Sequence, residues 1–575
     1  MTAVASSPSI RPWTVALALA AVVALGFGCG RLGGARPSGS GLNLLLVTLD
    51  TTRADRLGCY GHRAARTPRL DRLAAEGVRF ETALADAPIT LPSHASIFTG
   101  LHPFEHGVRN NGNFSLPDRF PTLATVLRER GYRTAAFVSS FILDRRYGLA
   151  RGFEVYDDRM SEEGRAESAP EAERRGDLTA GALGRWLAAR AAGPNEPPFF
   201  AWLHLYDPHE PYRPPSPFRE QFAADPYDGE IAFADATVGT VLDALDARGL
   251  LARTLVAVVA DHGESLGEHG EETHSMFLYE STLRVPLILW RPGVLPSGRV
   301  VRAPVRTVDL APTLLDVLGA PALGAPHARS LRAVVDGGAG GAPVAAYAET
   351  YVPRLYMGGA ALRMLRDDRY KLIAAPRPEL YDLAADPGET RNRFAEEPRI
   401  AGALQRGLEE LLSGAGDAMS VVAVDSEAAE KLNALGYVGA GAEAPSLDRA
   451  GEGKDPKDLI AVFNRLRRAN DALRDRRFGE ALPILDAALA EDPQNAFARM
   501  LRGNARLGLG QYGPALGEFR AYLALAPRSA QAHQWLAVCH LKLGDRPRAR
   551  AAFERALALQ PGYDDAVEGL RQARG

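Results

Sequence analysis

Cysteine is scarce in this chain of 575 residues, which contains only Cys29, Cys59 and Cys539. The three lie far apart, so the sequence does not predict a disulfide framework. Positive charge is not in excess either, because the formal net charge is −3, and there is no electrostatic reason to expect nucleic-acid binding. Hydrophobic residues make up 46% of the chain, which is enough for the cores of several globular domains.

The N-terminus carries an apolar run, Trp13–Gly28. Its length fits the core of an export signal better than a full membrane span. Cys29 follows and resembles a bacterial lipoprotein processing site, although Gly26 stands where that motif has Leu. We expect residues 1–29 to be a signal peptide, a lipoprotein signal or a short anchor, followed by a linker at 30–42. The protein is then exported to a bacterial periplasm or cell surface and held at the membrane by a lipid or short helix.

Apolar runs of the kind expected for strands buried on both faces alternate with helical patterns after residue 42. The four clearest runs are Asn43–Asp50, Arg133–Ser140, Pro198–Asp207 and Thr254–Asp261. This alternation predicts an α/β domain at 43–325, with a mainly parallel central sheet and helices on both of its faces. Shorter strand-like pieces between residues 345 and 395, with a helix at 399–412, predict a small second sheet in a subdomain at 345–440.

Polar residues follow each of the four strands. They are Asp50, Ser139 and Ser140, Asp207-Pro-His209, and Asp261-His262. In this architecture ligands bind beyond the carboxyl ends of the strands, so the four ends are expected to converge on an active site.

Two carboxylates and an imidazole, from Asp50, Asp261 and His262, are ligand types that suit a divalent metal. Thr90 lies in Pro-Ile-Thr-Leu-Pro-Ser-His, just before a short predicted helix that Gly100 ends. Alone it reads as a helix cap. With a metal it completes the ligand shell, and its hydroxyl becomes a nucleophile of lowered pKa.

Further side chains are placed to contact a substrate. His209 follows its strand directly, His274 lies in a polar loop, and His94 sits one turn into the Thr90 helix. An imidazole binds an ester oxygen or protonates a leaving group near neutral pH. Asn111 is a further donor to the same oxygens.

The C-terminal part of the chain repeats with a period of 34 residues, as Pro493, Pro527 and Pro561 show. Further positions keep this period: Ala469, Gly503 and Ala537; Ala481, Ala515 and Ala549; Leu485, Phe519 and Phe553. The pattern resembles the tetratricopeptide repeat. After a linker at 441–460, we expect an all-α solenoid at 461–575, with repeats at 462–495, 496–529 and 530–563, a capping helix, and a protein partner.

Residues 43–440 resemble the sulfatase family of the alkaline-phosphatase superfamily. The matching blocks are Asn43–Gly61, Pro88–Gly100, Leu203–Tyr212, Tyr227–Gly249, Val256–Gly270, Leu278–Gly293 and Tyr381–Asn392. The resemblance implies a metal-dependent ester hydrolase or group transferase, with Asp50, Asp261 and His262 as ligands and Thr90 at the nucleophile position.

The sequence departs from the family at central positions. Sulfatases carry a Cys or Ser that becomes formylglycine, followed by x-Pro-Ser-Arg, whereas this chain has Thr90-Leu-Pro-Ser-His94. The second aspartate of the family is Thr51, and its later lysine is His274. A Thr nucleophile is similar to that of the superfamily's phosphodiesterases and phosphoethanolamine-type transferases, in which Thr is modified covalently.

We therefore expect one divalent ion (Ca, Mn or Zn) and a covalent Thr90 intermediate on a phospho- or sulfo-ester of a small molecule, lipid or glycan. Two metals remain an alternative, with Asp207, His209 and His274 as further ligands. Two other functions stay open: a sulfuric ester hydrolase with non-formylglycine chemistry, and an inactive sulfatase-fold scaffold that binds proteins.

Overall fold

The computed structural model describes residues 41–160, 172–190, 196–338, 344–414, 419–422, 428, 431–432, 435 and 453–575. The predicted N-terminal signal and most of the linker expected at 441–460 lie outside these residues. Within the described part of the chain, no helix is long and apolar enough to cross a membrane.

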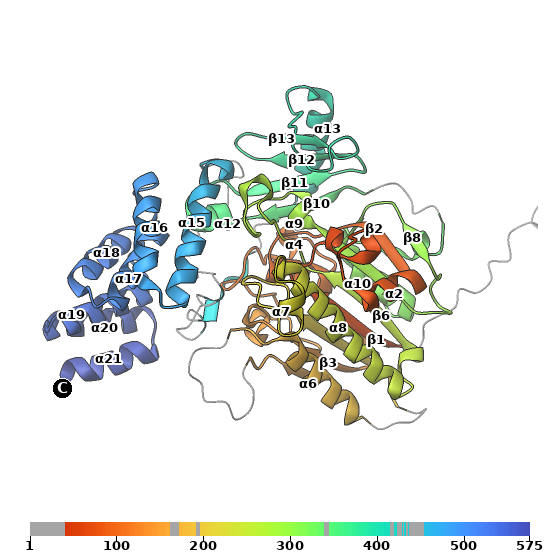
Figure 1. Ribbon diagram of the computed structural model, residues 1–575, viewed down its shortest axis with the longest axis horizontal. Helices are drawn as coiled ribbons and strands as arrows, with labels where there is room; N and C mark the ends of the chain where they lie inside the picture. Colours follow the sequence, from red (N-terminus) through yellow and green to blue (C-terminus); the bar gives the residue numbers. More distant parts are fainter. Residues whose placement is uncertain are drawn as a thin grey trace, which may run out of the picture. The chain divides into compact units, whose positions relative to one another are not determined.

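A nine-stranded mixed sheet forms the centre of the larger domain (Figure 1). Its order is β4-β3-β5-β1-β6-β7-β2-β8, and β9 pairs with β2. The strands are β1 (Asn43–Leu49), β2 (Val78–Leu84), β3 (Arg133–Phe137), β4 (Val155–Asp157), β5 (Phe199–Leu205), β6 (Thr254–Ala260), β7 (Arg284–Trp290), β8 (Arg299–Val301) and β9 (Val305–Arg306). Every residue of β1, β5 and β6 is buried, as expected for strands covered on both faces.

The central strands run parallel, so their carboxyl ends meet at one edge. β1 pairs in parallel with β5 and β6, and β3 pairs in parallel with β4 and β5. β7 is antiparallel to both β6 and β2. The α/β class and the four long strands are confirmed, and the structure adds β2, β4, β8 and β9, which the sequence did not indicate.

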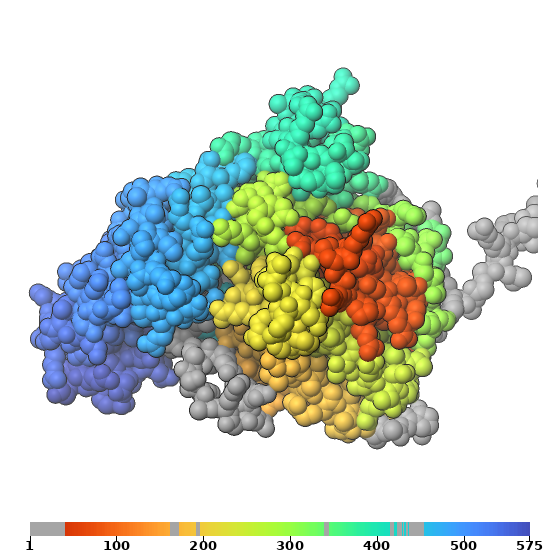
Figure 2. Space-filling model, viewed as in Figure 1, coloured from red at the N-terminus to blue at the C-terminus, as the bar shows by residue number. Residues whose placement is uncertain are grey.

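Helices cover the sheet in two layers. One layer contains α2 (Pro68–Glu76), α6 (Gly176–Ala188) and α8 (Pro226–Ala247), and the other contains α3 (Thr90–Thr99), α5 (Leu123–Glu129) and α10 (Leu310–Leu318). Figure 2 shows side chains around α2 in red and around α7 (Phe218–Gln221) and α8 in yellow to green closing over the strands on one face. Shorter helices in this part are α4 (Pro103–His106), α9 (Glu280–Leu283) and α11 (Arg332–Val335).

The predicted second sheet is present and antiparallel, in the order β10-β11-β12-β13. Its strands are β10 (Ala346–Thr350), β11 (Leu362–Arg366), β12 (Tyr370–Ala374) and β13 (Glu379–Asp382). Helix α13 (Pro398–Leu412) packs on it through Leu404 and Leu408, which share a core with Leu365, Leu372 and Leu380. Helix α12 (Val352–Met357) follows β10 directly.

Paired helices make up the C-terminal part. They are α15 (Pro456–Arg474), α16 (Phe478–Glu491), α17 (Ala496–Gly508), α18 (Tyr512–Leu525), α19 (Ala530–Lys542), α20 (Arg546–Leu559) and the capping helix α21 (Asp564–Arg574). The periodic small residues lie where helices touch. At Gly503, an added Cβ would come within 2.5 Å of the Phe519 ring. Close helix approach therefore depends on the absence of a side chain there.

Candidate active site

Two neighbouring strands deliver the first functional side chains to the same edge of the sheet. β1 and β6 are parallel, and Leu49 lies opposite Ala260 in their register. An aspartate follows each strand end, so Asp50 and Asp261 lie side by side. His262 comes next, and the ligand atoms of these three buried residues lie within 4.8 Å of one another. Among the residues that the structure describes, no other group of three or more His, Cys, Asp or Glu side chains is arranged to hold a metal.

Thr90 is the first residue of α3 and is fully buried next to Asp50. The sequence analysis placed it just before the helix, but the extended residue at that position is Ile89. The Thr90 Oγ1 atom makes no well-formed hydrogen bond within the described structure. It nevertheless lies near enough to Asp50 to lower the pKa of that carboxyl somewhat, against the effect of burial. Thr90 therefore does not cap its helix, and its hydroxyl is available for chemistry.

Three buried atoms of the aspartate–histidine group lack a hydrogen-bond partner among the residues that the structure describes: Asp50 Oδ1, Asp261 Oδ2 and His262 Nε2. His262 Nε2 lies 3.7 Å from Asp50 Oδ1 and 3.6 Å from Asp261 Oδ2. Burial raises the pKa of both carboxyls, and the charge of Asp50 raises that of Asp261 further. Because unpaired buried polar atoms are costly, this donor set fits a divalent cation, which would partner all three atoms.

Backbone hydrogen bonds fix which ligand atoms stay free. The N–H groups of Thr51 and His262 donate to Asp261 Oδ1 at 3.3 and 2.8 Å, which leaves Oδ2. His262 Nδ1 donates to the carbonyl of Gly263 at 2.9 Å. Since a carbonyl only accepts, and burial lowers the pKa of the ring, His262 is neutral and Nε2 keeps its lone pair. Thr51 itself donates its hydroxyl to the Pro208 carbonyl at 2.8 Å, so it is not a ligand.

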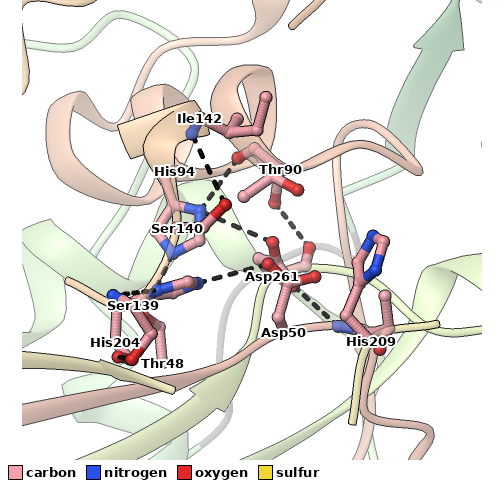
Figure 3. Close-up of polar contacts among 12 residues, drawn as sticks. Thr48, Asp50, Thr90, His94, Ser139, Ser140, Ile142, His204, His209 and Asp261 are labelled. Atoms are coloured by element: carbon pink, nitrogen blue, oxygen red, sulfur yellow. Dashed lines mark hydrogen bonds and ion pairs between the residues drawn. The ribbon is translucent and has the colours of Figure 1, made fainter. Parts of the chain in front are cut away.

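His204 is a site residue that the sequence analysis missed. It lies within β5 opposite Thr48, and its Nε2 is 3.2 Å from Asp50 Oδ2 (Figure 3). The backbone N–H of Ser139 donates to His204 Nδ1 at 3.3 Å, so the proton of the ring is on Nε2 and points to Asp50. Burial lowers the pKa of His204 to about 3, which keeps the ring neutral. His204 therefore occupies Asp50 Oδ2 and leaves Oδ1 for the cation.

The serines at the end of β3 support this arrangement and do not face a substrate. Ser139 Oγ donates to the backbone carbonyl of His204 at 2.8 Å. Ser140 Oγ accepts from the backbone N–H of Ile142 at 3.4 Å, as a cap of the short turn that follows. The strand ends converge as predicted. The two serines, however, bond to the backbone of His204 and of Ile142.

His94 and Asn111 differ in whether a side-chain atom remains without a hydrogen-bond partner among the described residues. His94 Nδ1 donates to the Thr90 carbonyl at 2.8 Å, and Nε2 lies 3.0 Å from Thr48 Oγ1, so both of its nitrogens have partners. His94 thus supports the start of α3. Asn111 Oδ1 accepts from the Leu91 N–H at 2.8 Å, and its buried Nδ2 has no partner among the described residues. Of the two, Asn111 retains a donor for a substrate oxygen.

His209 and His274 lie next to His262, on loops that follow β5 and β6. The His274 ring centroid is 4.7 Å from that of His262 and 5.1 Å from that of His209. His209 Nδ1 donates to the Glu210 carbonyl at 2.8 Å, so its buried, unpartnered Nε2 carries a lone pair. His274 Nδ1 lies 3.0 Å from Glu264 Oε1. Burial lowers the pKa of His274 to about 3 and raises that of Glu264, so both groups favour their neutral forms.

Asp207 does not join these histidines. Its Oδ2 accepts from the backbone N–H of Gly176 at 2.9 Å, and burial raises its pKa to about 7. Within the described ranges, Asp207, His209 and His274 do not form a three-ligand group. The geometry therefore favours one cation over the two-metal alternative.

Matches to known families divide the chain into the same parts as the structure. Residues 42–320 match the family model described as Sulfatase, and residues 267–414 match N-sulphoglucosamine sulphohydrolase, C-terminal. Residues 466–513 and 500–564 match the tetratricopeptide repeat.

Among curated relatives, the chain is 25% identical over 450 residues to Arylsulfatase K of Bos taurus, which covers 64% of this chain and 82% of the relative. It is also 25% identical over 424 residues to Delta 4,5-hexuronate-2-O-sulfatase of Bacteroides thetaiotaomicron, covering 62% and 85%. Among solved structures, the phosphonate monoester hydrolase of Agrobacterium radiobacter superimposes with a TM-score of 0.56 at 24% identity, covering 65% of this chain and 96% of the other. A 2-O GAG sulfatase gives 0.55 at 21% identity, covering 72% and 99%.

The mixed sheet and the small antiparallel sheet define the alkaline-phosphatase-like fold, and the family matches place the chain among ester hydrolases. Within that class, residues 42–414 belong to the sulfatase family, and tetratricopeptide repeats follow at 466–564. Both resemblances drawn from the sequence are confirmed.

Proposed function

We propose that this protein is a metal-dependent hydrolase or transferase of sulfate or phosphate esters that forms a covalent intermediate on Thr90. One observation carries the proposal: the buried Thr90 hydroxyl has no well-formed hydrogen bond and adjoins three unpartnered ligand atoms of Asp50, Asp261 and His262. A cation held by these three residues supplies charge neutralisation and lowers the pKa of a coordinated hydroxyl.

The chain's own groups account for the rest of the reaction. The Thr90 hydroxyl passes its proton to solvent water, its oxygen forms a bond to sulfur or phosphorus, and the bond from that centre to the alcohol oxygen breaks. The neutral His274–Glu264 pair holds a proton next to the site, and we assign to it the protonation of the departing oxygen. The Nδ2 of Asn111 is the donor for a remaining ester oxygen, and the Leu91 N–H at the start of α3 holds Asn111 in place through its Oδ1. Water, or an acceptor alcohol, then displaces the Thr90 oxygen.

A substrate panel with a matched variant tests this proposal. Full-length protein is assayed with short-chain alkyl and aryl forms of a sulfate ester, a phosphate monoester, a phosphodiester and a phosphonate monoester, each with Ca, Mn or Zn. Thr90→Ala should lose at least about a thousandfold in kcat, the scale expected when a nucleophile is removed. Mass spectrometry of the wild-type protein should show the transferred group on the peptide that contains Thr90.

The alternatives give different results in the same assay. A sulfuric ester hydrolase without formylglycine would act on the sulfate esters alone and carry a sulfo group on Thr90. An inactive scaffold would bind no metal by elemental analysis, and Thr90→Ala would change no activity. Either full activity of Thr90→Ala or the absence of metal-dependent turnover overturns the proposal.

We further propose that the repeats bind a protein partner, since stacked helix pairs present an extended concave surface. Cross-linking with the full-length protein as bait should recover one specific partner through residues of α16–α21. Recovery of nothing above a matched bait control counts against this role.

A further inference from the structure

The pocket next to His209 and His274 is closed by the repeat helices. It has a volume of ≈ 70 Å³ and is lined from three parts of the chain. The catalytic loops contribute His209, Glu210, Thr273 and His274; helix α12 contributes Val352, Tyr356 and Met357; the repeats contribute Phe463, Leu466, Arg467 and Phe497. His274 also adjoins His262, with 4.7 Å between the ring centroids, so one side chain separates the pocket from the proposed metal group.

Helix α15 is tied to the two loops that carry the histidines. The guanidinium of Arg467 forms an ion pair with Glu210, the neighbour of His209, and donates to Thr273 Oγ1 at 2.5 Å. Asn464, one turn earlier on the same helix, donates from Nδ2 to the Gly270 carbonyl at 2.7 Å. Arg467 is half-buried, with 20% of its side chain exposed, and desolvation lowers its pKa to about 10. Loss of its carboxylate partner would therefore leave a partly desolvated charge uncompensated.

Apolar side chains supply much of the pocket wall: Val352 and Met357 of α12, Phe463 and Leu466 of α15, and Phe497 of α17. Asn470, Asp471 and Arg474 of α15 add a polar strip to the same wall. Under the proposed function the phosphorus or sulfur centre lies at Thr90, which is not among the residues that line this pocket. The part of the ester that reaches this wall is then the alcohol portion, which apolar side chains can desolvate but cannot bind by hydrogen bonds.

We propose that α15 and α17 form the outer wall of the substrate pocket, and that this wall selects esters with a short apolar alcohol portion. The inference rests on the proposed function, because it places the ester centre at Thr90. The volume of ≈ 70 Å³ is well below the roughly 150 Å³ of an engineered cavity that admits benzene. Short aliphatic groups therefore fit, and aromatic or longer groups do not. Arg467 is a positioning residue that holds the wall against the two histidine loops and balances the charge of Glu210.

Binding of non-hydrolysable alkylphosphonates tests the wall without requiring turnover. Titration calorimetry of the full-length, metal-loaded protein is run with the methyl to hexyl members of the series. Wild-type affinity should be highest for a short chain. Phe463→Ala and Phe497→Ala, two half-buried positions on different helices, should each raise the ratio of hexyl to methyl affinity about tenfold or more. Leu525→Ala removes an apolar side chain that is 46% exposed at the end of α18 and should leave the ratio unchanged.

The positioning role of Arg467 predicts a rescue. Arg467→Met leaves the Glu210 carboxylate unbalanced near the anion, so the affinity for every phosphonate should fall at least about tenfold, without a change in chain-length preference. Adding Glu210→Gln should restore most of the loss. Arg465→Met, which removes an arginine of the same helix that pairs with Glu491 of α16 and not with the histidine loops, is the control and should have no effect.

Two results overturn the inference. One is an unchanged hexyl-to-methyl ratio in both phenylalanine variants while circular dichroism shows them folded; the other is failure of the wild-type protein to bind any alkylphosphonate. Thr90-dependent hydrolysis in the substrate panel would then still support the proposed function. Conversely, the hexyl-to-methyl affinity ratio could shift as expected while Thr90→Ala keeps full turnover. That result would support the wall and contradict the assignment of Thr90 as the nucleophile.

Discussion

The Nε2–H of His204 donates to Oδ2 of Asp50 across 3.2 Å, with both side chains fully buried. The backbone N–H of Ser139 fixes the ring from its other side, so the tautomer is determined by the fold. Because His204 occupies Oδ2, only the Oδ1 atom of Asp50 is left to contact a cation at the aspartate–histidine group. Hydrogen bonds behind a ligand of this kind set both its orientation and its basicity.

Loss of that hydrogen bond should weaken metal binding. His204→Leu keeps most of the volume of the ring but removes the donor, so the Asp50 carboxylate is free to turn. We expect the affinity for the activating metal to fall 10- to 100-fold, the usual order for such supporting groups. Competition titration with a fluorescent chelator measures it. His62→Gln, at a half-buried histidine paired with Asp228 away from the site, is the control, and equal affinities in the two variants would contradict the assigned role.

Removal of the metal should destabilise the protein as well as inactivate it. Without a cation, the buried carboxyls of Asp50 and Asp261 adjoin each other with their outer oxygens unpartnered. Because a ligand that binds only the folded state stabilises it by mass action, metal at 100 times its Kd adds about 2.7 kcal/mol. Dialysis against a chelator should lower Tm, and the matching divalent ion should restore it. An unchanged Tm in the chelated protein with activity retained would argue against the metal.

Two glycines of the repeats allow the effect of packing on stability to be compared with the effect of helix propensity. At Gly503 an added Cβ would lie 2.5 Å from the buried Phe519 ring, whereas at Gly517 nothing lies within 4 Å. Gly503→Ala should therefore destabilise the protein by about 1–3 kcal/mol through overpacking. Gly517→Ala should stabilise it by up to about 1 kcal/mol, because Ala is the better helix former. Thermal melts followed by circular dichroism compare the two, and a common sign would show that the ring contact is unimportant.

Asp235 predicts a pH dependence of stability. Its carboxyl accepts from the backbone N–H groups of Arg69 and Leu70 at the start of α2, and burial raises its pKa to about 7. With an unfolded pKa of about 3.9, the folded state binds more protons between pH 4 and 7, so this contribution to stability is lost as the pH rises through 7. From pH 5 to 8, wild-type Tm should fall more than that of Asp235→Asn, which keeps an acceptor and cannot ionise.

The control for this experiment lies on the same helix. Asp243 is 60% exposed and pairs with Arg69, so Asp243→Asn should follow the wild-type pH profile. If Asp235→Asn also parallels the wild type, the carboxyl of Asp235 is ionised across this range in the folded protein.

The sequence predicted the parts of the fold that long apolar runs or a regular repeat period mark. The runs that became β1, β5 and β6 are buried throughout, and the 34-residue period located the repeats. β2 was missed because Val78–Leu84 contains Arg79, Glu81 and Thr82 and alternates between buried and half-buried positions, so no continuous apolar run marks it.

The site residues also divide into those that a sequence pattern marks and those that it does not. Asp50, Asp261 and His262 were found because they end strands, where an α/β sheet presents its ligands. His204 lies inside the apolar strand β5, opposite Thr48, which is two residues before Asp50. Glu264 lies in the loop after His262, where its sequence neighbours do not distinguish it from a solvent-exposed residue. Their roles depend on which strands are neighbours, since His204 meets Asp50 only because β5 pairs with β1. A polar residue such as His204 opposite Thr48 in two buried strands is the signal to look for.

Arg467 contacts Glu210 and Thr273 from a helix that also begins the repeat array. Catalytic domain and repeats are thus not interchangeable modules. An ancestor that exchanged its repeat array for another would have lost a side of its pocket at the same time, and recombination at the linker between them would be penalised. Substitutions in α15 should therefore be constrained by both halves, whereas no described residue of α18–α21 lines the pocket.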